Sequence, residues 1–162
     1  MSYYLIIRGP LGCGKTTIAK KLAKTLPAKY FDIDKILLDN NLINDQEQGY
    51  ISQRSLIKVN EILAVVAEKF IKKGKPIIFD GNFYWQAVLQ DLIRRLNFPH
   101  YVFTLKVPVE VCLERDKKRK SPLGQDAVEV VYKKTNEFDY GINIDATKSE
   151  EEIIKEIANY IK

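Results

Sequence analysis

A glycine-rich segment near the N-terminus constrains the fold of this 162-residue chain more than any other feature. Residues 9–16 read Gly-Pro-Leu-Gly-Cys-Gly-Lys-Thr. An apolar, β-prone run from Tyr3 to Ile7 precedes this segment. A pattern with apolar residues at every fourth position, from Lys15 to Leu26, follows it and indicates a helix with one buried face. A strand that turns through glycines into such a helix is typical of α/β proteins with a parallel sheet.

The rest of the chain continues to alternate between short apolar runs and amphipathic patterns. Predicted strands cover 29–33, 77–80, 101–107 and 142–145, and predicted helices cover 52–73, 85–96, 108–120, 126–137 and a last segment capped by Ser149. The polar stretch 40–48 has no clear period. We therefore predict a three-layer α/β fold with a five-stranded, mostly parallel sheet flanked by helices. No linker interrupts the pattern, so residues 1–162 are expected to form a single domain.

The glycine-rich segment also fits the Walker A pattern, Gly-x-x-x-x-Gly-Lys-Thr. Gly12 and Gly14 allow the main chain to bend so that several N–H groups point at phosphate oxygens, and the start of the helix adds a positive dipole end. Lys15 can reach the β- and γ-phosphates, Thr16 can ligate Mg²⁺, and Thr17 can reach the α-phosphate. The pattern predicts a nucleoside triphosphate but not a reaction. The predicted nucleotide-binding residues are Gly9, Pro10, Leu11, Gly12, Cys13, Gly14, Lys15, Thr16 and Thr17.

Composition adds weaker constraints. The net charge of +5 suits an anionic ligand or nucleic acid, and it equally fits a lysine-rich solvated surface. The two cysteines, Cys13 and Cys112, do not form a disulfide framework. No apolar run approaches the ~20 residues that cross a bilayer, and the N-terminus lacks the pattern of a signal peptide. We expect a cytoplasmic protein that does not associate with membranes.

Four features follow one another along the chain in a recognisable order. They are the glycine-rich loop, Asp32-Ile33-Asp34, Asp80-Gly81, and the basic run Arg115-Asp116-Lys117-Lys118-Arg119. Together they resemble the small P-loop kinases, the group of shikimate, gluconate and adenylylsulfate kinases, and the AAA_33-type kinases that include polynucleotide-kinase-type domains. The resemblance spans nearly the whole chain without identifying one member. It implies a P-loop NTPase fold with a short lid at about 115–128 and an acceptor-binding segment at about 35–60.

Carboxylates stand at the ends of two predicted strands. Asp32 and Asp34 would share one face if the strand extends that far, at the edge where α/β sheets bind ligands. The resemblance implies that Asp34 orients the acceptor hydroxyl and takes its proton, while Asp32 lies nearer the Mg²⁺. Alternatively, these are turn aspartates, one of which caps a helix. Asp80 closes an apolar strand as a Walker B acid does and would hold Mg²⁺, unless it is a plain turn residue.

Other polar side chains are candidates for the lid and the acceptor pocket. Arg115 and Arg119 lie four residues apart on a predicted helix and would neutralise the transferred phosphoryl group, although a solvated basic face fits as well. Arg54 is a candidate for an anionic acceptor group. Asn82 follows Asp80 and precedes three aromatic residues that could line a pocket. The resemblance places Thr147 near the adenine.

The predicted function is transfer of the γ-phosphoryl group of MgATP to a hydroxyl of a small molecule, with ATP and Mg²⁺ as cofactors. The expected catalytic residues are Lys15, Asp34, Arg115 and Arg119. A nucleotide or polynucleotide kinase is an alternative in the same reaction class, although the basic residues are scattered and do not favour nucleic acid. An ATPase or switch without an acceptor is an alternative of another class.

Overall fold

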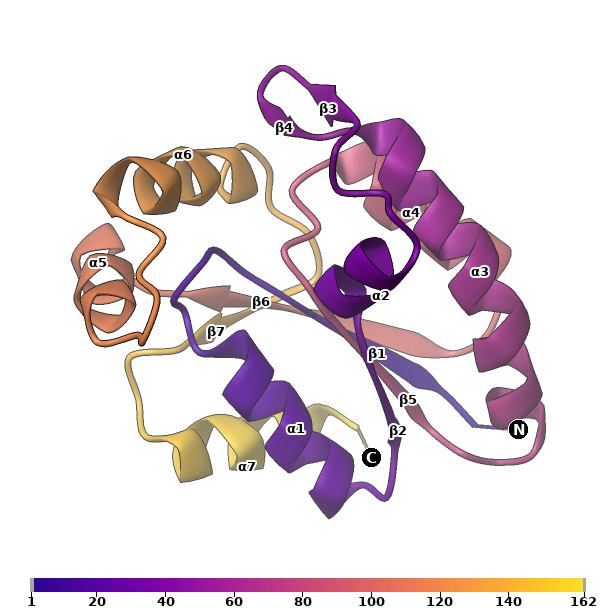
Figure 1. Ribbon diagram of the computed structural model, residues 1–162. Coiled ribbons are helices and arrows are strands. Elements are labelled where there is room, and N and C mark those ends of the chain that lie inside the picture. The colour runs from indigo at the N-terminus through magenta and orange to yellow at the C-terminus, as the bar shows by residue number, and fades with distance from the viewer. Residues whose placement is uncertain (1, 162) are drawn as a thin grey trace.

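A five-stranded parallel sheet forms the centre of the computed structural model, which describes residues 2–161 (Figure 1). Its strands are β1 (Tyr4–Arg8), β2 (Lys29–Asp32), β5 (Ile77–Gly81), β6 (His100–Lys106) and β7 (Ile142–Asp145). They lie in the order β2-β5-β1-β6-β7, and each neighbouring pair is parallel. The predicted α/β class and the five strands are confirmed, and within this sheet the strands are all parallel.

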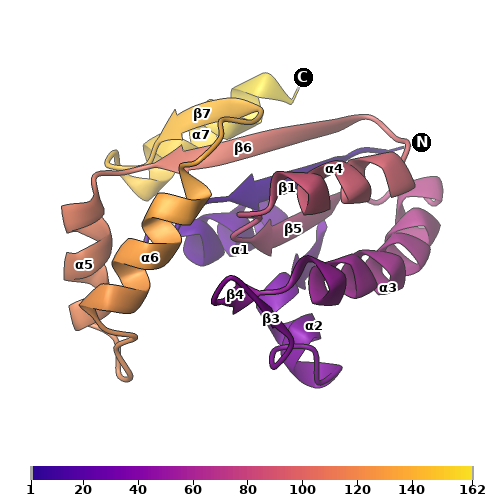
Figure 2. The same cartoon turned by 90° about the horizontal axis from the view of Figure 1, so that it is seen from above.

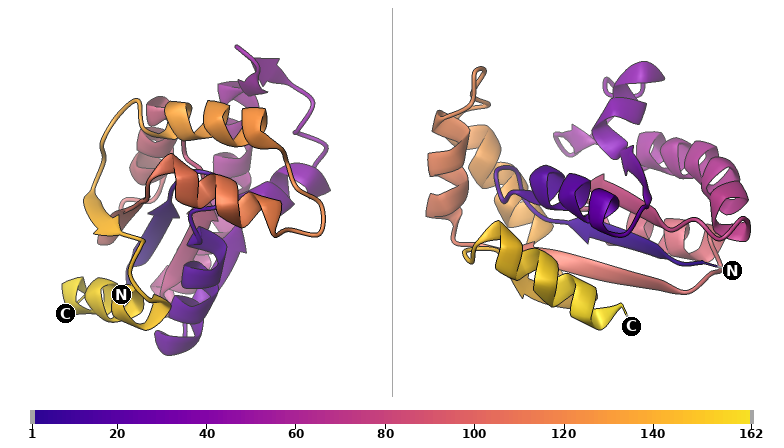
Figure 3. Two further views of the ribbon diagram at one scale, coloured as in Figure 1. Left: turned by 90° about the vertical axis from the view of Figure 1, so that its left-hand side faces the viewer. Right: turned by 90° about the horizontal axis from the view of Figure 1, so that it is seen from below.

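Helices cover both faces of the sheet. They are α1 (Lys15–Thr25), α2 (Ile33–Asp39), α3 (Gln53–Lys72), α4 (Gln86–Arg95), α5 (Val109–Lys117), α6 (Gln125–Thr135) and α7 (Glu150–Tyr160). Helices α1 and α7 lie side by side on one face (Figure 3), and α3 packs against α4 on the other. Helices α5 and α6 pack together beyond the end of β6 (Figure 2). None of the helices within residues 2–161 is long and apolar enough to cross a membrane.

The side chains of β1 alternate between the two layers of the core, as the period of a strand requires. Leu5 and Ile7 pack in the cluster that contains α1 and α7, whereas Tyr4 and Ile6 pack in the cluster that contains α3 and α4. All five residues of β1 are buried. The glycine-rich loop that follows Arg8 therefore begins from the most constrained part of the molecule.

The first correction concerns Asp32 and Asp34. Strand β2 ends at Asp32, and α2 begins at Ile33, so the prediction that the two aspartates share a strand face is wrong. Asp32 instead caps α2, because its carboxylate accepts hydrogen bonds from the N–H groups of Asp34 at 3.0 Å and Lys35 at 3.4 Å. Asp34 therefore lies in the first turn of a helix.

The second difference lies in the polar stretch after α2. Residues Gln46–Glu47 (β3) and Tyr50–Ile51 (β4) form a two-stranded antiparallel hairpin. Its connecting residues, Gln48 and Gly49, both have positive φ values, 54° and 83°, as a type I′ turn requires. Strands of two residues are too short to leave a periodic pattern, which is why the sequence gives no sign of them. The hairpin falls within the predicted acceptor-binding segment.

Candidate active site

The glycine-rich loop and α5 enclose a cleft at the carboxyl end of the sheet. Within the loop, Gly12 and Gly14 have φ values of 79° and 93°, which L-residues with a side chain rarely adopt. A Cβ atom on Gly12 would lie 2.8 Å from the carbonyl oxygen of Cys112, so this glycine also allows the loop to pack against α5. The loop residues that line the cleft are Gly12, Gly14, Lys15, Thr16 and Thr17.

Other residues of the predicted loop form its buried support. Gly9, Pro10 and Cys13 are buried, and Cys13 packs its side chain into the core cluster of α1. Burial raises the pKa of the Cys13 thiol, which keeps the side chain neutral. These three residues therefore shape the loop through packing. Leu11 lies on another side of the loop and lines the neighbouring cavity described below.

A hydrogen-bonded group links the loop to β5. The Thr16 hydroxyl donates to Oδ2 of Asp80 at 2.8 Å, and the Tyr30 hydroxyl donates to the same oxygen at 2.5 Å. The other carboxylate oxygen, Oδ1 of Asp80, is buried and has no hydrogen-bond partner in the described chain. Asp32 pairs in register with Asp80, so both side chains leave the same face of the sheet.

This group has the chemistry of a magnesium site. Carboxylate and hydroxyl oxygens are the ligands that Mg²⁺ prefers, and the unpaired Oδ1 of Asp80 is an available acceptor. Residues 2–161 contain no group of three or more His, Cys, Asp or Glu side chains that could hold a metal. The residues therefore fit a cation that takes its other ligands from phosphate and water, as Mg²⁺ in nucleotide sites usually does.

Asp34 lines a second cavity, and its carboxylate is close enough to Lys15 of the phosphate cleft to feel its charge. Desolvation raises the pKa of this carboxylate; Lys15 opposes this shift, and the charges of Asp32 and Asp80 add to it. A carboxyl group with a raised pKa holds a proton more readily than a free aspartate does. The position and the pKa of Asp34 both suit the predicted role of a base.

Two arginines reach the phosphate cleft from the opposite side to the loop. Arg115 and Arg119 both line the cleft with Lys15, and Nη1 of Arg115 donates a long hydrogen bond of 3.4 Å to the carbonyl of Gly12. The turn that follows is fixed by Asp116, which accepts hydrogen bonds of 3.0 Å from the N–H groups of Leu123 and Gly124. The structure thus gathers three cations around one space where a triphosphate would lie.

A further cavity continues the cleft between the loop and α7. It is lined by loop residues, by Arg115, by α7, and by Ala146 and Lys148 after β7. Thr147 lies between these two residues but is not among the lining residues. Its N–H and its hydroxyl both donate to Oδ1 of Asp145, at 3.0 and 2.6 Å. The structure thus puts the segment that carries Thr147 next to the cleft, and an adenine contact by Thr147 stays a prediction.

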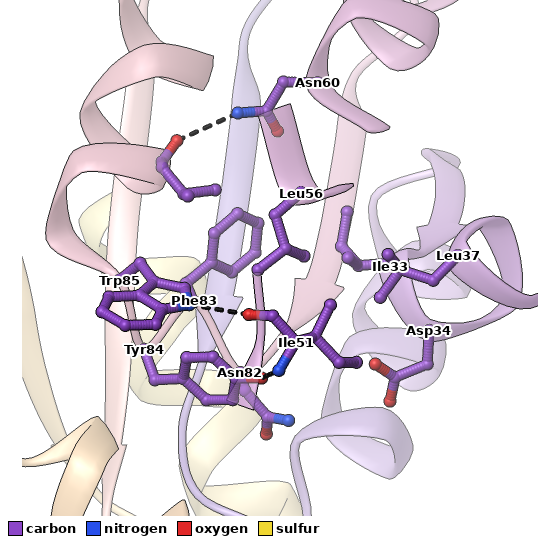
Figure 4. Close-up of a pocket in the computed structure, with 11 residues that line it drawn as sticks. Ile33, Asp34, Leu37, Ile51, Leu56, Asn60, Asn82, Phe83, Tyr84 and Trp85 are labelled. Carbon is purple, nitrogen blue, oxygen red and sulfur yellow. Dashed lines mark hydrogen bonds between the residues drawn. The ribbon is translucent and has the colours of Figure 1, made fainter. Parts of the chain in front are cut away.

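An acceptor-side cavity lies beside Asp34, between α2, the hairpin, α3 and the loop after β5 (Figure 4). Figure 4 shows Asp34 and Asn82 at one end of it and Asn60 toward the other. Arg54 is not among the residues that line it. Its guanidinium group instead pairs with Asp45 through bonds of 2.7 and 3.2 Å, and it is exposed. The lining residues are Ile33, Asp34, Leu37, Ile51, Leu56, Asn60, Asn82, Phe83, Tyr84, Trp85 and Val88.

Comparison with known proteins fits this arrangement. Residues 5–139 match the AAA_33 family, whose description is an AAA domain. The chain belongs to the AAA_33 family. A curated relative from Pyrococcus furiosus, named "Putative adenylate kinase", is 29% identical over 167 residues, which cover 97% of this chain and 83% of the relative. The predicted resemblance to small P-loop kinases is confirmed.

Two solved structures share the fold of this AAA_33 chain. A sugar kinase from Janibacter sp. HTCC2649 superposes with a TM-score of 0.82 at 18% identity, over 99% of this chain and 95% of that one. A gluconokinase from Sinorhizobium meliloti 1021 has a TM-score of 0.71 at 14% identity, over 94% and 87% of the two chains. At these identities the likeness establishes the fold alone.

Reasoning from the sequence missed two residues that support the site of this AAA_33 chain. Tyr30 lies in an apolar strand and reads as a core residue, yet its hydroxyl contacts Asp80. Arg8 ends β1 and is fully buried. It donates to Oγ1 of Thr104 at 3.1 Å and to the carbonyls of Phe83 at 3.3 Å and Thr135 at 2.9 Å. The only available signal was an arginine directly after an apolar strand.

Arg8 supports an unusual backbone conformation in the acceptor-side cavity. Phe83 has a φ of 46°, which is rare for a bulky residue and persists only where the surrounding structure holds it. The hydrogen bond from Arg8 to the Phe83 carbonyl supplies part of that support. Burial lowers the pKa of Arg8 to about 10, so the guanidinium group is still charged at neutral pH.

Proposed function

We propose that this P-loop kinase transfers the γ-phosphoryl group of ATP to a hydroxyl of a small molecule bound in the acceptor-side cavity. The observation that carries the proposal is the position of Asp34. This carboxylate lines the enclosed cavity and is close enough to Lys15 of the phosphate loop to feel its charge. A carboxylate between a phosphate cleft and an enclosed pocket is what an acceptor hydroxyl needs for in-line attack.

The proposed reaction uses Asp34 as the base. Its carboxylate takes the proton of the acceptor hydroxyl as the hydroxyl oxygen bonds to the γ-phosphorus, and the bond from that phosphorus to the β–γ bridging oxygen breaks to leave ADP. Lys15, Arg115 and Arg119 line the cleft in which negative charge would gather on the transferred group. Because Arg115 also contacts the loop carbonyl of Gly12, it is positioned before any ligand binds.

In this proposal Thr16 and Asp80 hold Mg²⁺, with Asp32 on the same face of the sheet. The metal would neutralise charge on the β- and γ-phosphates. The hydrogen bond from the Thr16 hydroxyl to Asp80 leaves the hydroxyl lone pairs free for a cation. Residues of about 115–128 act as the lid. Residues of about 35–60, which contain most of α2, the hairpin and the start of α3, act as the acceptor-binding segment.

A nucleoside monophosphate is the second candidate acceptor, because the Pyrococcus furiosus relative carries the name of an adenylate kinase. An ATPase or switch without an acceptor has less support, since such a protein has no need of an enclosed cavity beside Asp34. A direct assay with different acceptors separates these three functions.

The test measures ADP release from MgATP with and without a panel of alcohols, sugars and nucleotides. The proposal is supported if an acceptor stimulates ADP release by the wild type and Lys15→Ala lowers this release by about 10²-fold or more. Lys24→Ala is the matched control, because Lys24 lies exposed in the last turn of the same helix. Slow release that no acceptor changes would show an ATPase instead. Absence of any heat on mixing folded protein with MgATP would refute nucleotide binding itself.

A further inference from the structure

Among residues 2–161, no positively charged side chain lines the acceptor side of the site. The cavity beside Asp34 has no Lys, Arg or His among its lining residues. An adjoining cavity between the hairpin and α6 shares Asp34, Asn82 and Tyr84 with it and also has none. Its lining residues are Leu11, Asp34, Leu37, Ile43, Gln46, Gly49, Tyr50, Ile51, Asn82, Tyr84, Leu123, Ala127, Val130 and Val131. Asp34 is the one charged side chain in either set.

From this we infer that the acceptor is an uncharged alcohol with a largely apolar or aromatic body and a second hydrogen-bond donor, and not a phosphate- or carboxylate-bearing molecule. The inference rests on the proposed function and narrows it. Proteins bind phosphate and carboxylate groups mainly through arginine and lysine. An anionic acceptor here would be desolvated beside the Asp34 carboxylate without a cation among the lining residues to pair with it, which is costly.

Several cations outside the two cavities already have a partner or line the phosphate cleft. Arg54 makes two hydrogen bonds with Asp45 and points to solvent. Lys134 lies 3.9 Å above the ring of Trp85 and pairs with Glu137 at 3.0 Å. Lys15, Arg115 and Arg119 line the phosphate cleft, where a triphosphate needs them. Moving Arg54 or Lys134 to an anion in the acceptor-side cavity would break the contacts that each of them makes.

The aromatic walls of the cavity present carbon to a ligand. The hydroxyl of Tyr84 accepts a hydrogen bond of 3.1 Å from the N–H of Ile51, and the indole N–H of Trp85 donates to the carbonyl of Ile51 at 2.8 Å (Figure 4). Tyr50 packs against both rings, with centroids 5.4 and 6.0 Å away. The indole N–H is engaged with Ile51, and the Tyr84 oxygen already accepts from Ile51. These residues therefore offer their ring surfaces and the O–H hydrogen of Tyr84 to a bound molecule.

One fully buried polar atom of the cavity lining has no hydrogen-bond partner among the described residues. Oδ1 of Asn82 is buried and accepts no hydrogen bond from any described residue. Asn60 has both its amide hydrogens engaged, with the carbonyl of Val88 and with Asp91, each at 3.0 Å. A buried acceptor without a donor is costly to leave unpaired. A hydroxyl or amide N–H of the ligand would satisfy Asn82 while a second hydroxyl faces Asp34.

The experiment compares matched pairs of probes that differ by one charge. The first pair is 4-(hydroxymethyl)benzamide and 4-(hydroxymethyl)benzoate, and the second is a nucleoside and its 5′-monophosphate. Binding is measured by calorimetry with the protein saturated with MgADP, and transfer is measured as ADP release from MgATP. The uncharged member of a pair is expected to bind about tenfold or more tightly, because burying an unpaired anion costs more than ~1.4 kcal/mol.

Two variants assign the preference to the cavity. Leu56→Ala removes part of the wall and should weaken the uncharged probe about tenfold, whereas Val65→Ala, an exposed position (59%) on the same helix, should not. Val130→Arg adds a cation at the exposed rim of the cavity between the hairpin and α6. It should lower the ratio of affinities between the uncharged and the charged probe by about fivefold or less. Neither α3 variant should alter the affinity for MgADP.

The outcomes separate the inference from the proposed function. Equal or tighter binding of the charged probes, or no binding of any uncharged probe, overturns the inference. Transfer to a charged acceptor overturns the inference while the kinase function stands. MgATP binding without transfer to any acceptor, charged or uncharged, contradicts the proposed function.

Discussion

The Thr16 hydroxyl and Oδ2 of Asp80 lie 2.8 Å apart, joining the phosphate loop to strand β5. Asp80→Asn keeps the shape of the side chain but removes the charge that a cation needs. We expect the affinity for MgATP to fall by about 10–100-fold and the affinity for metal-free ATP to change little. Calorimetry with and without Mg²⁺ measures both.

Tyr30→Phe serves as the control for this variant. It removes one hydrogen bond from the same carboxylate oxygen but leaves the charge of Asp80 in place. Its effect on MgATP binding should therefore be smaller than that of Asp80→Asn. Equal losses from the two variants would mean that Asp80 acts through packing and not through a metal.

Arg115 is expected to act on the transferred phosphoryl group. Arg115→Ala should lower kcat by about 10²–10³-fold, the range seen when one donor to a developing charge is removed, with little change in the KM for ATP. Arg94→Ala is the control, because that side chain is exposed on α4 and pairs only with Asp91. A rise in KM with kcat unchanged would assign Arg115 to ground-state binding of the nucleotide.

Asp34→Asn should abolish transfer and make the unliganded protein more stable at neutral pH. Desolvation raises the pKa of Asp34 in the folded state, so between its ordinary pKa and the raised one the folded state holds more protons than the unfolded state. The contribution of Asp34 to the free energy of unfolding therefore falls as pH rises from its ordinary pKa to the raised one. The contribution stays low at higher pH. The Tm of Asp34→Asn at pH 7 should exceed that of the wild type.

The same variant tests the role of Asp34 in the reaction. Transfer by the wild type should decline as pH falls through the raised pKa, because the base becomes protonated. The measurement is the pH profile of kcat/KM for the acceptor, with melting curves over the same range. Normal turnover by Asp34→Asn, or a Tm lower than that of the wild type at pH 7, would contradict the assignment.

Arg8→Met should destabilise the fold by about 2–4 kcal/mol, because the buried carbonyls of Phe83 and Thr135 would lose their donor. It should also raise the KM for the acceptor, since Arg8 holds the Phe83 segment of the cavity. Arg54→Met removes an exposed ion pair with Asp45, which water and salt screen, and should therefore destabilise the fold much less. Urea unfolding compares the two, and similar losses would show that the Arg8 network contributes little.

The sequence predicted the parts of this structure that depend on local pattern and on the order of elements. The sheet, the long helices and the phosphate loop follow from apolar periodicity and from the spacing of Gly9, Gly14, Lys15 and Thr16. The pairing of Thr16 with Asp80 could also be expected, because the glycine-rich loop leaves the carboxyl end of β1 and Asp80 lies near the carboxyl end of the neighbouring strand β5.

What the sequence did not predict depends on contacts between distant segments or on very short elements. Helix α2 was hidden because Asp32 reads equally well as a strand end and as a helix cap. Tyr30 looked like a core residue, since only the folded chain brings its hydroxyl to Asp80. Arg54 looked available for a ligand, but Asp45, nine residues earlier, occupies its guanidinium group.

The phosphate cleft and the acceptor-side cavity are built from different segments of the chain. The phosphate side comes from the loop before α1 and from α5, while the acceptor side comes mainly from α2, the hairpin, α3 and the segment after β5. In the proposed function, substitutions in the segments of the acceptor side can therefore change which acceptor binds without changing the residues that bind the nucleotide. An exchange of the segments that form one half of the site would therefore leave the other half intact.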